Sequence, residues 1–596
     1  MRLQRHTTHG HVRHILLVLA ATALAVAVLV LDGDRLVTDD QRARAQTASR
    51  PNFVFVMTDD LDKQSMHQLD GIRAMMGSNG TTFENAFVNY ALCCPSRATI
   101  LRGQYPHNHG ITGSPTSLEP HFRELGEDQS TVATWLDKAG YQTKYVGKYM
   151  NDYRGPYIPP GWDEWFALSG DVDNNEVNDD GQSLTLAGNS TDAFATETSD
   201  FIRRSHANPA PFFVMVGTKA PHSPPEVPER YLNSFANASL PRPPNFDEVD
   251  VLDKPAWVKA FPRLTLDQIT KEQTKYRQRL RSMLAVEDLL RQTIATLQET
   301  GEIDNTYIIF TSDNGFHQGQ HRLVPGEKKT PYEEDIRIPL IVRGPGVPAG
   351  AIRKQMVINN DFAPTIATLA GVPIPTFVDG RSFTPLLAAS PPSSWRTAFL
   401  EEGTWQPNVP PVPMNKGIRT TRYSYVEYDT GEHELYDLST DPYQLDSKPQ
   451  AGNEQLYSTL QTRLNALRDC SGAVCRANEW DTQVISTIPK ANATAVPPTA
   501  TVGAIFSEDM RASSITATTF KLVTLNFDGT TTNVTATVSY DAATEKAILN
   551  PSSDLSSGAT YKATVTTGAQ DLAGNALDQN PTLAGNQSKS WKFTVQ

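Results

Sequence analysis

Five short runs of apolar residues stand out between positions 53 and 342 of the chain. They do not alternate with polar residues, and they are rich in Val, Ile, Phe and Tyr, which is typical of strands that are buried on both faces of a parallel sheet. The runs occupy residues 53–57, 142–146, 211–216, 307–310 and 338–342. We therefore expect five buried parallel strands in this part of the chain.

Residues 274–298 have a helical pattern instead. Apolar side chains recur on one face of this segment, among Arg, Gln and Glu residues; they are Leu280, Leu284, Leu290, Ile294 and Leu297. Strands that alternate with helices of this kind predict a doubly wound α/β domain, which we place at residues 46–345. Pro-rich loops and the strand-like segments 423–428 and 434–438 predict a smaller α+β subdomain with antiparallel strands at residues 346–484.

The composition changes after residue 484. Thr, Val, Ala and Ser dominate, and the alternating runs 535–540 and 561–566 predict an all-β sandwich at residues 485–596, preceded by a linker at 491–500. Through the sequence DLAGNAL and its closing strand, this part resembles the Ig-like modules of bacterial secreted proteins. Asp571 and Asn575 within DLAGN are expected to form a turn, with metal binding as the alternative.

The charge of the chain narrows the range of partners. The sequence of 596 residues has a formal net charge of −13, so the basic surface that nucleic acid requires is missing overall. With 39% hydrophobic and 20% charged residues, the chain has the composition of a folded globular protein. A coiled coil, a fibre and a membrane protein with several spans are excluded.

The N-terminus predicts export. Arg2, Arg5 and Arg13 precede an apolar run at residues 15–31, which is long for a signal peptide and short for a membrane span. Residues 1–45 are therefore a signal peptide cleaved after a sequence such as Ala43-Arg44-Ala45, or an uncleaved anchor in the membrane. In either case the protein is secreted or extracytoplasmic.

The chain has only four cysteines, too few for a disulfide scaffold. Cys470 and Cys475 could close a small disulfide loop, or remain as two reduced thiols. Cys93 and Cys94 are adjacent, and neighbours rarely pair with each other. We therefore expect one of these two residues to have a chemical role.

Three of the predicted strands end in residues that bind metals or protons. Asp59 and Asp60 follow the first strand, Asp313 and Asn314 follow the fourth, and His222 follows the third. Because the ligand crevice of an open α/β sheet lies at the carboxyl ends of its strands, these side chains should meet there. Adjacent aspartates point to opposite faces of a strand, so the chain must turn at this point. The oxygen ligands suit Ca²⁺ or Mg²⁺ better than zinc, whereas the alternative is a set of ordinary turn and cap residues.

The segment ALCCPSRATILRG at residues 91–103 carries the pattern Cys-x-Pro-Ser-Arg, followed by Arg-Gly. It resembles the signature of the sulfatase family, which implies that Cys93 is oxidised to formylglycine by a formylglycine-generating or other maturation enzyme. Cys94 then occupies the variable position. Independently, Pro95 favours the first turn of a helix, whose amides attract an anion, and Arg97 could hold the hydrated aldehyde.

The resemblance to sulfatases extends over roughly residues 50–450 and implies an alkaline-phosphatase/sulfatase type of fold with a mixed sheet. It rests on APHSP around residue 222, SDNG at 312–315, EKKTPYEEDIRIP at 327–339, ELYDL at 434–438 and GYQTKYVGKY at 140–149, after which Met150 departs from the family pattern. The implied metal ligands are Asp59, Asp60, Asp313, Asn314 and an oxygen of the modified Cys93. The implied sulfate-binding and leaving-group residues are Lys148, His222 and Lys328, with Lys329 as the competing lysine.

The sequence QYPHNH at 104–109 resembles a segment of glycosaminoglycan sulfatases, N-acetylglucosamine-6-sulfatases among them. It implies a sulfated carbohydrate as substrate, with aryl sulfates as small substitutes. His109 and His317 are candidates for contacts with this substrate, although a histidine in such a loop can equally be a structural hydrogen-bonding residue, as we expect for His321.

The predicted reaction is the hydrolysis of a sulfate monoester. The formylglycine hydrate attacks sulfur, the metal and the cations neutralise the sulfonyl oxygens, and His222 or Lys328 protonates the departing alcohol. Calcium is favoured over magnesium because the ligand set exceeds an octahedron of six. The alternatives are hydrolysis of a phosphate ester on the same architecture, and a secreted protein that binds sulfated glycans without cleaving them.

Overall fold

The computed structural model of the chain describes residues 50–596 except 114–117, 171–174, 324–327, 393–394, 405–410, 480–481, 543, 572–573 and 580–585. The predicted export segment and its cleavage site lie outside the described residues. Within the described part of the chain, no helix combines the length and the apolar character that a membrane span requires.

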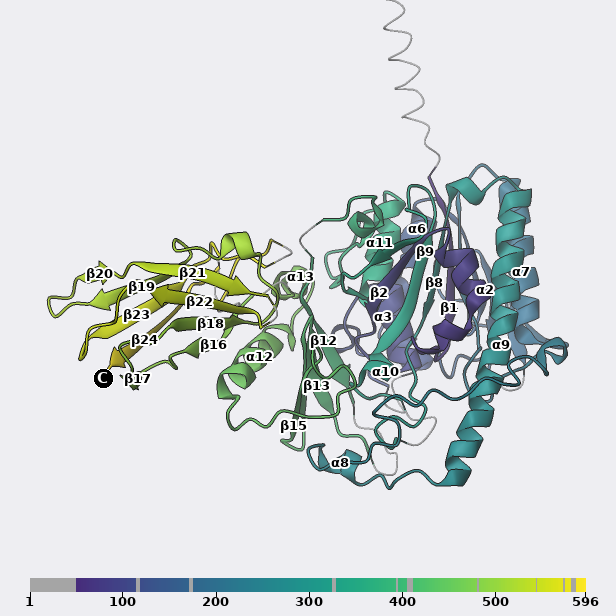
Figure 1. The fold of residues 1–596 in the computed structure, drawn as a ribbon. Coiled ribbons are helices and arrows are strands. Elements are labelled where there is room, and N and C mark those ends of the chain that lie inside the picture. Colours follow the sequence, from purple (N-terminus) through teal and green to yellow (C-terminus); the bar gives the residue numbers. More distant parts are fainter. Residues whose placement is uncertain are drawn as a thin grey trace, which may run out of the picture. The chain divides into compact units, whose positions relative to one another are not determined.

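A large mixed sheet forms the centre of the first domain (Figure 1). Its strands in the described chain are β1 (Asn52–Thr58), β2 (Thr81–Phe87), β3 (Gln142–Gly147), β4 (Glu164–Leu168), β5 (Glu176–Asp179), β6 (Gln182–Thr185), β7 (Phe212–Gly217), β8 (Thr306–Ser312), β9 (Arg337–Arg343), β10 (Ala351–Arg353) and β11 (Val357–Ile358). Their order is β10-β2-β9-β8-β1-β7-β3-β4-β5-β6, and β11 also pairs with β2. The predicted strands that became β1, β3, β7 and β8 are parallel to one another.

The fifth predicted strand has the opposite direction. β9 runs antiparallel to both β8 and β2, so the prediction of a parallel strand at residues 338–342 was wrong. In its described residues, the connection from β8 contains only the short helix α10 (Glu333–Ile336), whereas parallel neighbours are usually joined by a longer helix. Ile338, Leu340 and Val342 are fully buried all the same, so burial on both faces does not reveal strand direction.

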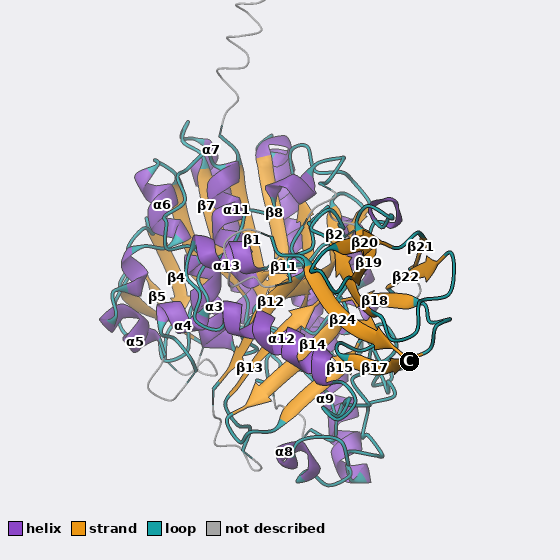
Figure 2. Cartoon of the chain, turned by 90° about the vertical axis from the view of Figure 1, so that its left-hand side faces the viewer, coloured by secondary structure: helices purple, strands orange, loops and turns teal. Residues whose placement is uncertain are grey.

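Helices cover both faces of the sheet (Figures 1 and 2). On one face Phe53 and Phe55 of β1 pack in a core with α3 (Cys93–Arg102), α6 (Val132–Lys138) and α11 (Phe362–Leu369). On the other face Val54 and Val56 pack in a core with α7 (Ser190–His206) and α9 (Leu266–Glu299). Since β10, β11 and α11 all follow residue 345, this layered unit extends past the boundary expected from the sequence.

The helix predicted at residues 274–298 is part of α9, which starts earlier, at Leu266. Thr265 caps it, and Gln268 completes a reciprocal capping box. Leu266 is 83% exposed, so the first turns lack the apolar face by which the sequence revealed the rest. Shorter helices of the domain are α2 (Asp70–Ile72), α4 (Pro106–His109), α5 (Glu119–Glu124) and α8 (Ala256–Lys259).

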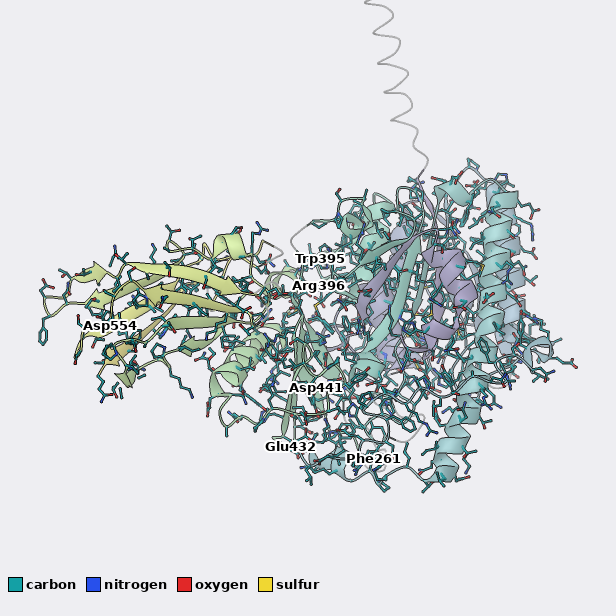
Figure 3. All side chains as sticks on the ribbon, viewed as in Figure 1. Phe261, Trp395, Arg396, Glu432, Asp441 and Asp554 are labelled. Atoms are coloured by element: carbon teal, nitrogen blue, oxygen red, sulfur yellow. A yellow bond between two sulfur atoms is a disulfide. The ribbon has the colours of Figure 1, made fainter. Side chains whose placement is uncertain are left out.

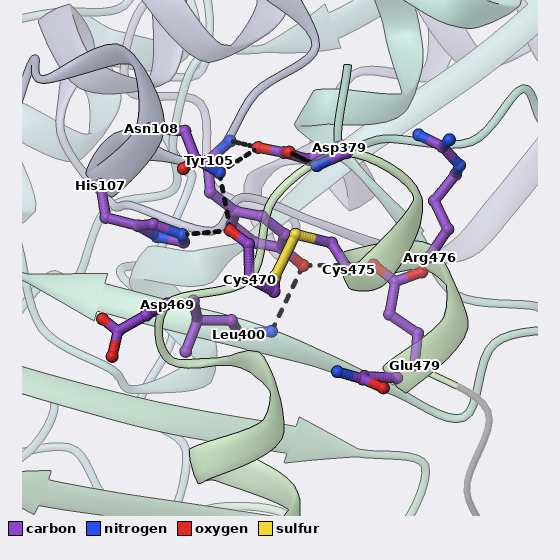
Figure 4. The surroundings of a disulfide bond; sticks show 12 residues. Tyr105, His107, Asn108, Asp379, Leu400, Asp469, Cys470, Cys475, Arg476 and Glu479 are labelled. Carbon is purple, nitrogen blue, oxygen red and sulfur yellow. Dashed lines mark hydrogen bonds between the residues drawn. A yellow bond between two sulfur atoms is a disulfide. The ribbon is translucent and has the colours of Figure 1, made fainter. Parts of the chain in front are cut away.

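An antiparallel sheet follows, in the order β12 (Ala398–Gly403), β13 (Asn415–Thr420), β14 (Tyr423–Tyr428) and β15 (His433–Asp437), with helices α12 (Glu454–Leu467) and α13 (Ala473–Asn478). The predicted disulfide between Cys470 and Cys475 is confirmed. The Cys470 carbonyl lies 2.8 Å from Nε2 of His107 and accepts a hydrogen bond from Asn108, so the disulfide loop is held against α4 (Figure 4).

A buried arginine organises the end of this region. Arg396, labelled in Figure 3, is fully buried and donates two hydrogen bonds, of 2.7 and 2.8 Å, to Asp361. Its guanidinium also lies 3.3 Å from Glu479, which accepts from Arg381 at 2.8 Å. Glu479 is therefore part of the buried interior of this region.

Two sheets form the β-sandwich in the described residues after 483. One contains β16 (Val484–Ile488), β18 (Val502–Phe506), β22 (Lys546–Pro551) and β21 (Ala536–Asp541). The other contains β17 (Ala493–Val496), β24 (Lys589–Val595), β23 (Thr560–Val565), β19 (Phe520–Leu525) and β20 (Thr531–Asn533). Because β17 pairs with β24, residues 491–500 are not a linker, and this prediction was wrong: the small residues of β17 belong to an edge strand.

Hydrogen bonds join Asp571 and Asn575, the two ends of the DLAGN segment. Both carboxylate oxygens of Asp571 accept hydrogen bonds from Asn575, and one of them also accepts from Thr482. These bonds occupy the carboxylate within the sandwich, which supports the expected turn rather than a metal site.

Candidate active site

The ends of β1 and β8 bring the four predicted oxygen ligands together. These strands are parallel neighbours with Thr58 opposite Ser312, so the residues that follow them leave the sheet side by side. Asp60 has a φ angle of 71°, which supplies the turn that adjacent aspartates need. Its backbone N–H donates to Asp313 at 3.1 Å, and Asn314 donates to its carboxylate at 2.8 Å.

The thiol of Cys93, on helix α3, also lies against this group of carboxylates. Cys93 is the first residue of α3, and its sulfur lies 3.3 Å from Oδ1 of Asp59. Ligand atoms of Asp59, Asp60, Cys93 and Asp313 all lie within 4.8 Å of one another. We call these four residues with Asn314 the acidic cluster. Cys94 instead packs in the hydrophobic core, which leaves Cys93 as the cysteine of the site.

Three buried cations surround the acidic cluster. Lys148, which follows β3, contacts the carboxylate of Asp59. Lys328 contacts the carboxylate of Asp60, and its Nζ lies 2.9 Å from the sulfur of Cys93. Arg97 of α3 donates from Nε to Asp313 at 2.7 Å and from a terminal nitrogen to the Lys148 carbonyl at 2.5 Å. Three cations thus pair with three carboxylates in the cluster.

His222 lies at the more exposed side of the cluster. It follows β7, its Nε2 is 3.8 Å from Oδ2 of Asp60, and its side chain is 29% exposed. Burial lowers the pKa of His222 and outweighs the aspartates Asp59 and Asp60, while Lys148 and Lys328 lower it further. The imidazole is therefore mainly neutral at neutral pH in this state.

Burial and charge set the protonation of the other groups. Burial alone would raise the pKa of Asp59, but Lys148, His222 and Arg97 hold it well below its usual value. Burial and the Asp59 charge raise the pKa of Asp313 to about 6. Burial and the same aspartate also raise the pKa of the Cys93 thiol, so a thiolate nucleophile is disfavoured in this environment.

The acidic cluster fits a hard divalent cation. The Oδ1 atom of Asn314 is buried and has no hydrogen-bond partner among the described residues, although a buried amide oxygen normally has one. Carboxylate and amide oxygens are the ligands that Ca²⁺ and Mg²⁺ prefer. The sulfur of Cys93 is the single soft atom of the set, and its conversion to an oxygen group would leave ligands of one kind.

Residues 51–372 match the protein-family model of the sulfatases. The chain belongs to the sulfatase family. Residues 319–470 match the model described as N-sulphoglucosamine sulphohydrolase, C-terminal, and residues 480–595 match a bacterial Ig-like domain. The mixed sheet and the C-terminal sandwich of this sulfatase confirm the predicted fold class, and membership of the family makes it a hydrolase of sulfate esters.

Several known proteins are similar to this sulfatase over most of its length. N-acetylglucosamine-6-sulfatase from Capra hircus is 34% identical over 492 residues, which cover 72% of this chain and 86% of the relative. A solved protein in complex with its substrate D-glucosamine-2-N,6-O-disulfate is 26% identical, with a TM-score of 0.60, covering 72% of this chain and 99% of that chain. Phosphonate monoester hydrolase from Silicibacter pomeroyi, 22% identical with a TM-score of 0.57 over 70% of this chain and 96% of that one, shares the fold.

The structure does not bring His109 to the acidic cluster of this sulfatase. Its side chain is 1% exposed, Nε2 lies 3.0 Å from the Thr99 hydroxyl, and Nδ1 accepts from the backbone N–H of Ile111. No hydrogen bond or ion pair within the described chain joins it to the cluster. The ring therefore fixes the loop after α3, as in the structural alternative considered from the sequence.

His317 lies close in sequence to the cluster but is also buried. Its Nδ1 is 2.9 Å from Asp335, whose other carboxylate oxygen accepts a 2.7 Å hydrogen bond from the hydroxyl of Thr330. His317 thus connects the loop of Asp313 to the loop of Lys328. His321 stacks on Tyr332 at 4.0 Å and lies 2.6 Å from Glu248, in agreement with a structural role.

Two basic residues near the cluster were missed from the sequence. Arg279 of α9 donates to the carbonyl oxygen of Asp60 at 2.5 Å and to that of Pro221 at 3.1 Å, and so holds both active-site loops. Lys275 lies one turn earlier on the same helix. The four-residue spacing of the two cations was visible in the sequence, but nothing there separated them from the other charged residues of the helix.

Proposed function

We propose that this sulfatase removes the 6-O-sulfate of a glucosamine unit in a sulfated glycan, by means of a formylglycine made from Cys93 and a bound divalent metal. The position of Cys93 carries this proposal: its sulfur lies against Asp59 at 3.3 Å and against Lys328 at 2.9 Å, at the N-terminus of α3. The names of the relatives described above support the choice of substrate, because they refer to sulfated glucosamine.

Conversion of Cys93 to formylglycine would supply an aldehyde hydrate, whose hydroxyl group is a nucleophile for sulfur. The residues of the chain prepare the site for the sulfate group. Lys148 and Lys328 project into it as ammonium groups whose pKa values are raised: burial lowers them, but Asp59 and Asp60 respectively outweigh it. Both therefore remain charged at neutral pH and neutralise the sulfonyl oxygens.

Arg97 has a positioning role in this proposal. Its guanidinium is 1% exposed and binds Asp313 and the Lys148 carbonyl, so it orients a metal ligand and a sulfate-binding lysine together. The proposed metal site consists of the acidic cluster, and the metal would act as a Lewis acid towards the sulfate ester. Calcium is proposed over magnesium because its coordination accepts more than six oxygens.

The leaving alcohol requires a proton, and His222 and Lys328 are the two groups that can supply it. His222 is the more exposed of the two, with 29% of its side chain accessible against 8% for Lys328, so it faces the side from which a sugar can depart. We assign the proton donor to His222, whose neutral imidazole must first take up a proton beside the bound anionic sulfate ester, and the sulfate contact to Lys328. Export by the apolar segment at residues 15–31 would place the activity outside the cytoplasm.

The experiment combines mass spectrometry with a substrate panel. In the active protein, the peptide containing residues 93–97 should carry an aldehyde in place of the Cys93 thiol. N-acetylglucosamine 6-sulfate should release sulfate, while the corresponding 6-phosphate should react far more slowly. Cys93→Ser should lose turnover and Cys94→Ala should keep it. An intact thiol in a fully active enzyme, or multiple turnover by Cys93→Ser at the parental rate, would contradict the mechanism.

A further inference from the structure

Lys275 of α9 is a partly buried ammonium group. It forms no hydrogen bond or ion pair with any residue that the structure describes. Its nearest described interaction is with the ring of Phe316, whose centroid lies 5.0 Å from Nζ. By contrast, Lys271 on the same helix is 75% exposed and pairs with Asp267 at 2.7 Å.

The position of Lys275 is fixed relative to the active site by its neighbours. Arg279 follows by four residues, so the two side chains lie on the same face of α9. Arg279 donates to the backbone of Asp60 and of Pro221, the residue before His222, and its guanidinium lies 4.2 Å from the Phe316 ring centroid. Phe316 itself is only two residues after Asn314. The turn that carries Lys275 is thus clamped to the loops of the acidic cluster.

The structure gives this lysine little compensation for its burial. Burial lowers the pKa of Lys275, and the charge of Glu272 raises it. The charge of Asp60 also raises this pKa and that of Lys328 lowers it, so the lysine lies within electrostatic reach of the site. The Phe316 face is shared with Arg279, and a cation–π contact contributes only about 0.5–2 kcal/mol. Glu272 does not form an ion pair with it, and one Glu272 carboxylate oxygen is buried with no hydrogen-bond partner in the described chain.

We propose that Lys275 is a specificity residue, which binds a second anionic group of the substrate while the reacting sulfate lies at Cys93. This inference rests on the proposed function, because it concerns the sugar that carries the reacting ester. The shared chemistry is a sulfonate or carboxylate close to the ester. Its two sources are an N-sulfo group on the same glucosamine and the carboxylate of an adjoining uronic acid.

The choice of an anion over a hydroxyl group follows from the charge of the surroundings. An ammonium group is a strongly hydrated donor with no acceptor, and a partly desolvated one gains most from an ionised oxygen. Arg279, Lys328 and Lys148 lie around the acidic cluster. Its three carboxylates already form ion pairs with Arg97, Lys148 and Lys328. Within the described site, Lys275 is therefore available for an anion from outside the protein.

The test compares kcat/KM for three substrates: N-acetylglucosamine 6-sulfate, glucosamine 2-N,6-O-disulfate, and a uronate-linked disaccharide of the first sugar. Lys275→Met keeps the apolar stem and removes the charge, and Lys271→Met makes the same change at the exposed position. We expect Lys275→Met to reduce the preference for one doubly charged substrate by about tenfold, as expected for loss of a charge-assisted hydrogen bond. Lys275→Arg should restore part of it, and Lys271→Met should not change it.

Each outcome bears on the inference. Loss of preference for the disulfate identifies the N-sulfo group, and loss of preference for the disaccharide identifies the uronate. An equal fall for all three substrates, or no change, would overturn the inference and leave the proposed function intact. If the parent enzyme hydrolyses none of the three, the proposed function fails. In that case, calorimetry measures the binding of the same sugars to Cys93→Ala and to the double variant Cys93→Ala, Lys275→Met. If the ratio of the affinities for the doubly and singly charged sugars is the same in both proteins, the role of Lys275 is refuted.

Discussion

The Nζ atom of Lys328 lies 2.9 Å from the sulfur of Cys93 and also contacts the carboxylate of Asp60. One ammonium group thereby touches both the proposed nucleophile and a proposed metal ligand. The adjacent Lys329, which the sequence left as a competitor, has a φ angle of 85°, so the chain turns between the two lysines. The geometry favours Lys328 as the residue that contacts the substrate sulfate.

The first prediction follows from this contact. Lys328→Met should lower kcat by about 10²–10³-fold, the effect of removing one preorganised electrostatic group. Lys329→Met is the matched control, with the same change of side chain one position later, and should keep most of the activity. Sulfate release from an aryl sulfate measures both. A larger loss in Lys329→Met than in Lys328→Met would contradict the assignment.

The second prediction separates the proton donor from the sulfate-binding residues. His222→Gln should lower the hydrolysis of a sugar sulfate by about 10²-fold or more, because a general acid contributes that much to the departure of a poor leaving group. Hydrolysis of nitrophenyl sulfate should fall much less, because a phenolate leaves without a proton. Comparable losses for both substrates would show that His222 binds the sulfate or holds the site together, and the proton would then come from Lys328.

The strand ends show how much of the site could be predicted from the sequence. The apolar runs before Asp59 and Asp313 have the length of buried strands, and the carboxyl ends of parallel strands meet at one edge, so pattern alone brought these ligands together. The direction of β9 could not be predicted, since both faces of the strand are buried whichever way it runs. The sandwich strand β17 was missed because Pro497 and Pro498 follow its small residues, a composition typical of linkers.

The histidines and the residues of α9 show why the other roles in and around the site could not be predicted from the sequence. A loop histidine has the same pattern whether it faces a substrate or the interior, and only the structure reveals the two internal partners of His109. Arg279 belongs to a helix rich in charged residues, and its role depends on the backbone carbonyls of two distant loops. Contacts of side chains with backbone atoms leave no signal in the types of residues along the chain.

The third prediction concerns the metal. Calcium at one hundred times its dissociation constant should stabilise the folded state by about 2.7 kcal/mol, and a chelator should remove this effect. Asp313→Asn should abolish the calcium-dependent shift in Tm, whereas Asp571→Asn in the Ig-like domain should retain it, because hydrogen bonds occupy that carboxylate. Differential scanning calorimetry with calcium and with magnesium measures the shift. A shift that persists in Asp313→Asn would place the metal elsewhere.

The fourth prediction uses the buried imidazole of His109. Burial, with a smaller contribution from the charge of Arg102, lowers its pKa to about 3. At a pH between about 3 and about 6.5, His109 is protonated in the unfolded state but neutral in the folded state. Stability from the neutral ring is therefore complete above pH 6.5 and is lost as the pH falls below it, by up to about 1.4 kcal/mol per pH unit.

Denaturant unfolding of the parent and of His109→Gln at several pH values between 4 and 7 checks this slope. The difference in unfolding free energy between the two proteins should shrink as the pH falls, because glutamine does not titrate. Parallel curves for His109→Gln would mean that the ring takes up its proton inside the folded protein.

The last prediction concerns the division between the sulfatase region and the Ig-like domain. A chain that ends at Asp481 removes the sandwich from its first strand onward but keeps Glu479, whose carboxylate accepts from Arg381 at 2.8 Å and lies 3.3 Å from the fully buried Arg396. This shortened sulfatase should fold and cleave a small aryl sulfate at a rate close to that of the full chain, since no member of the acidic cluster is lost. Full-length Glu479→Gln should instead be destabilised by about 1.5–3 kcal/mol, because the buried Arg396 loses one carboxylate but keeps its two hydrogen bonds to Asp361. If the shortened protein folds but cleaves only polymeric glycans more slowly, the sandwich directs the enzyme to its substrate. Loss of aryl sulfate turnover in a folded shortened chain would instead show that the Ig-like domain contributes to the active site, and the domain boundary would have to be redrawn.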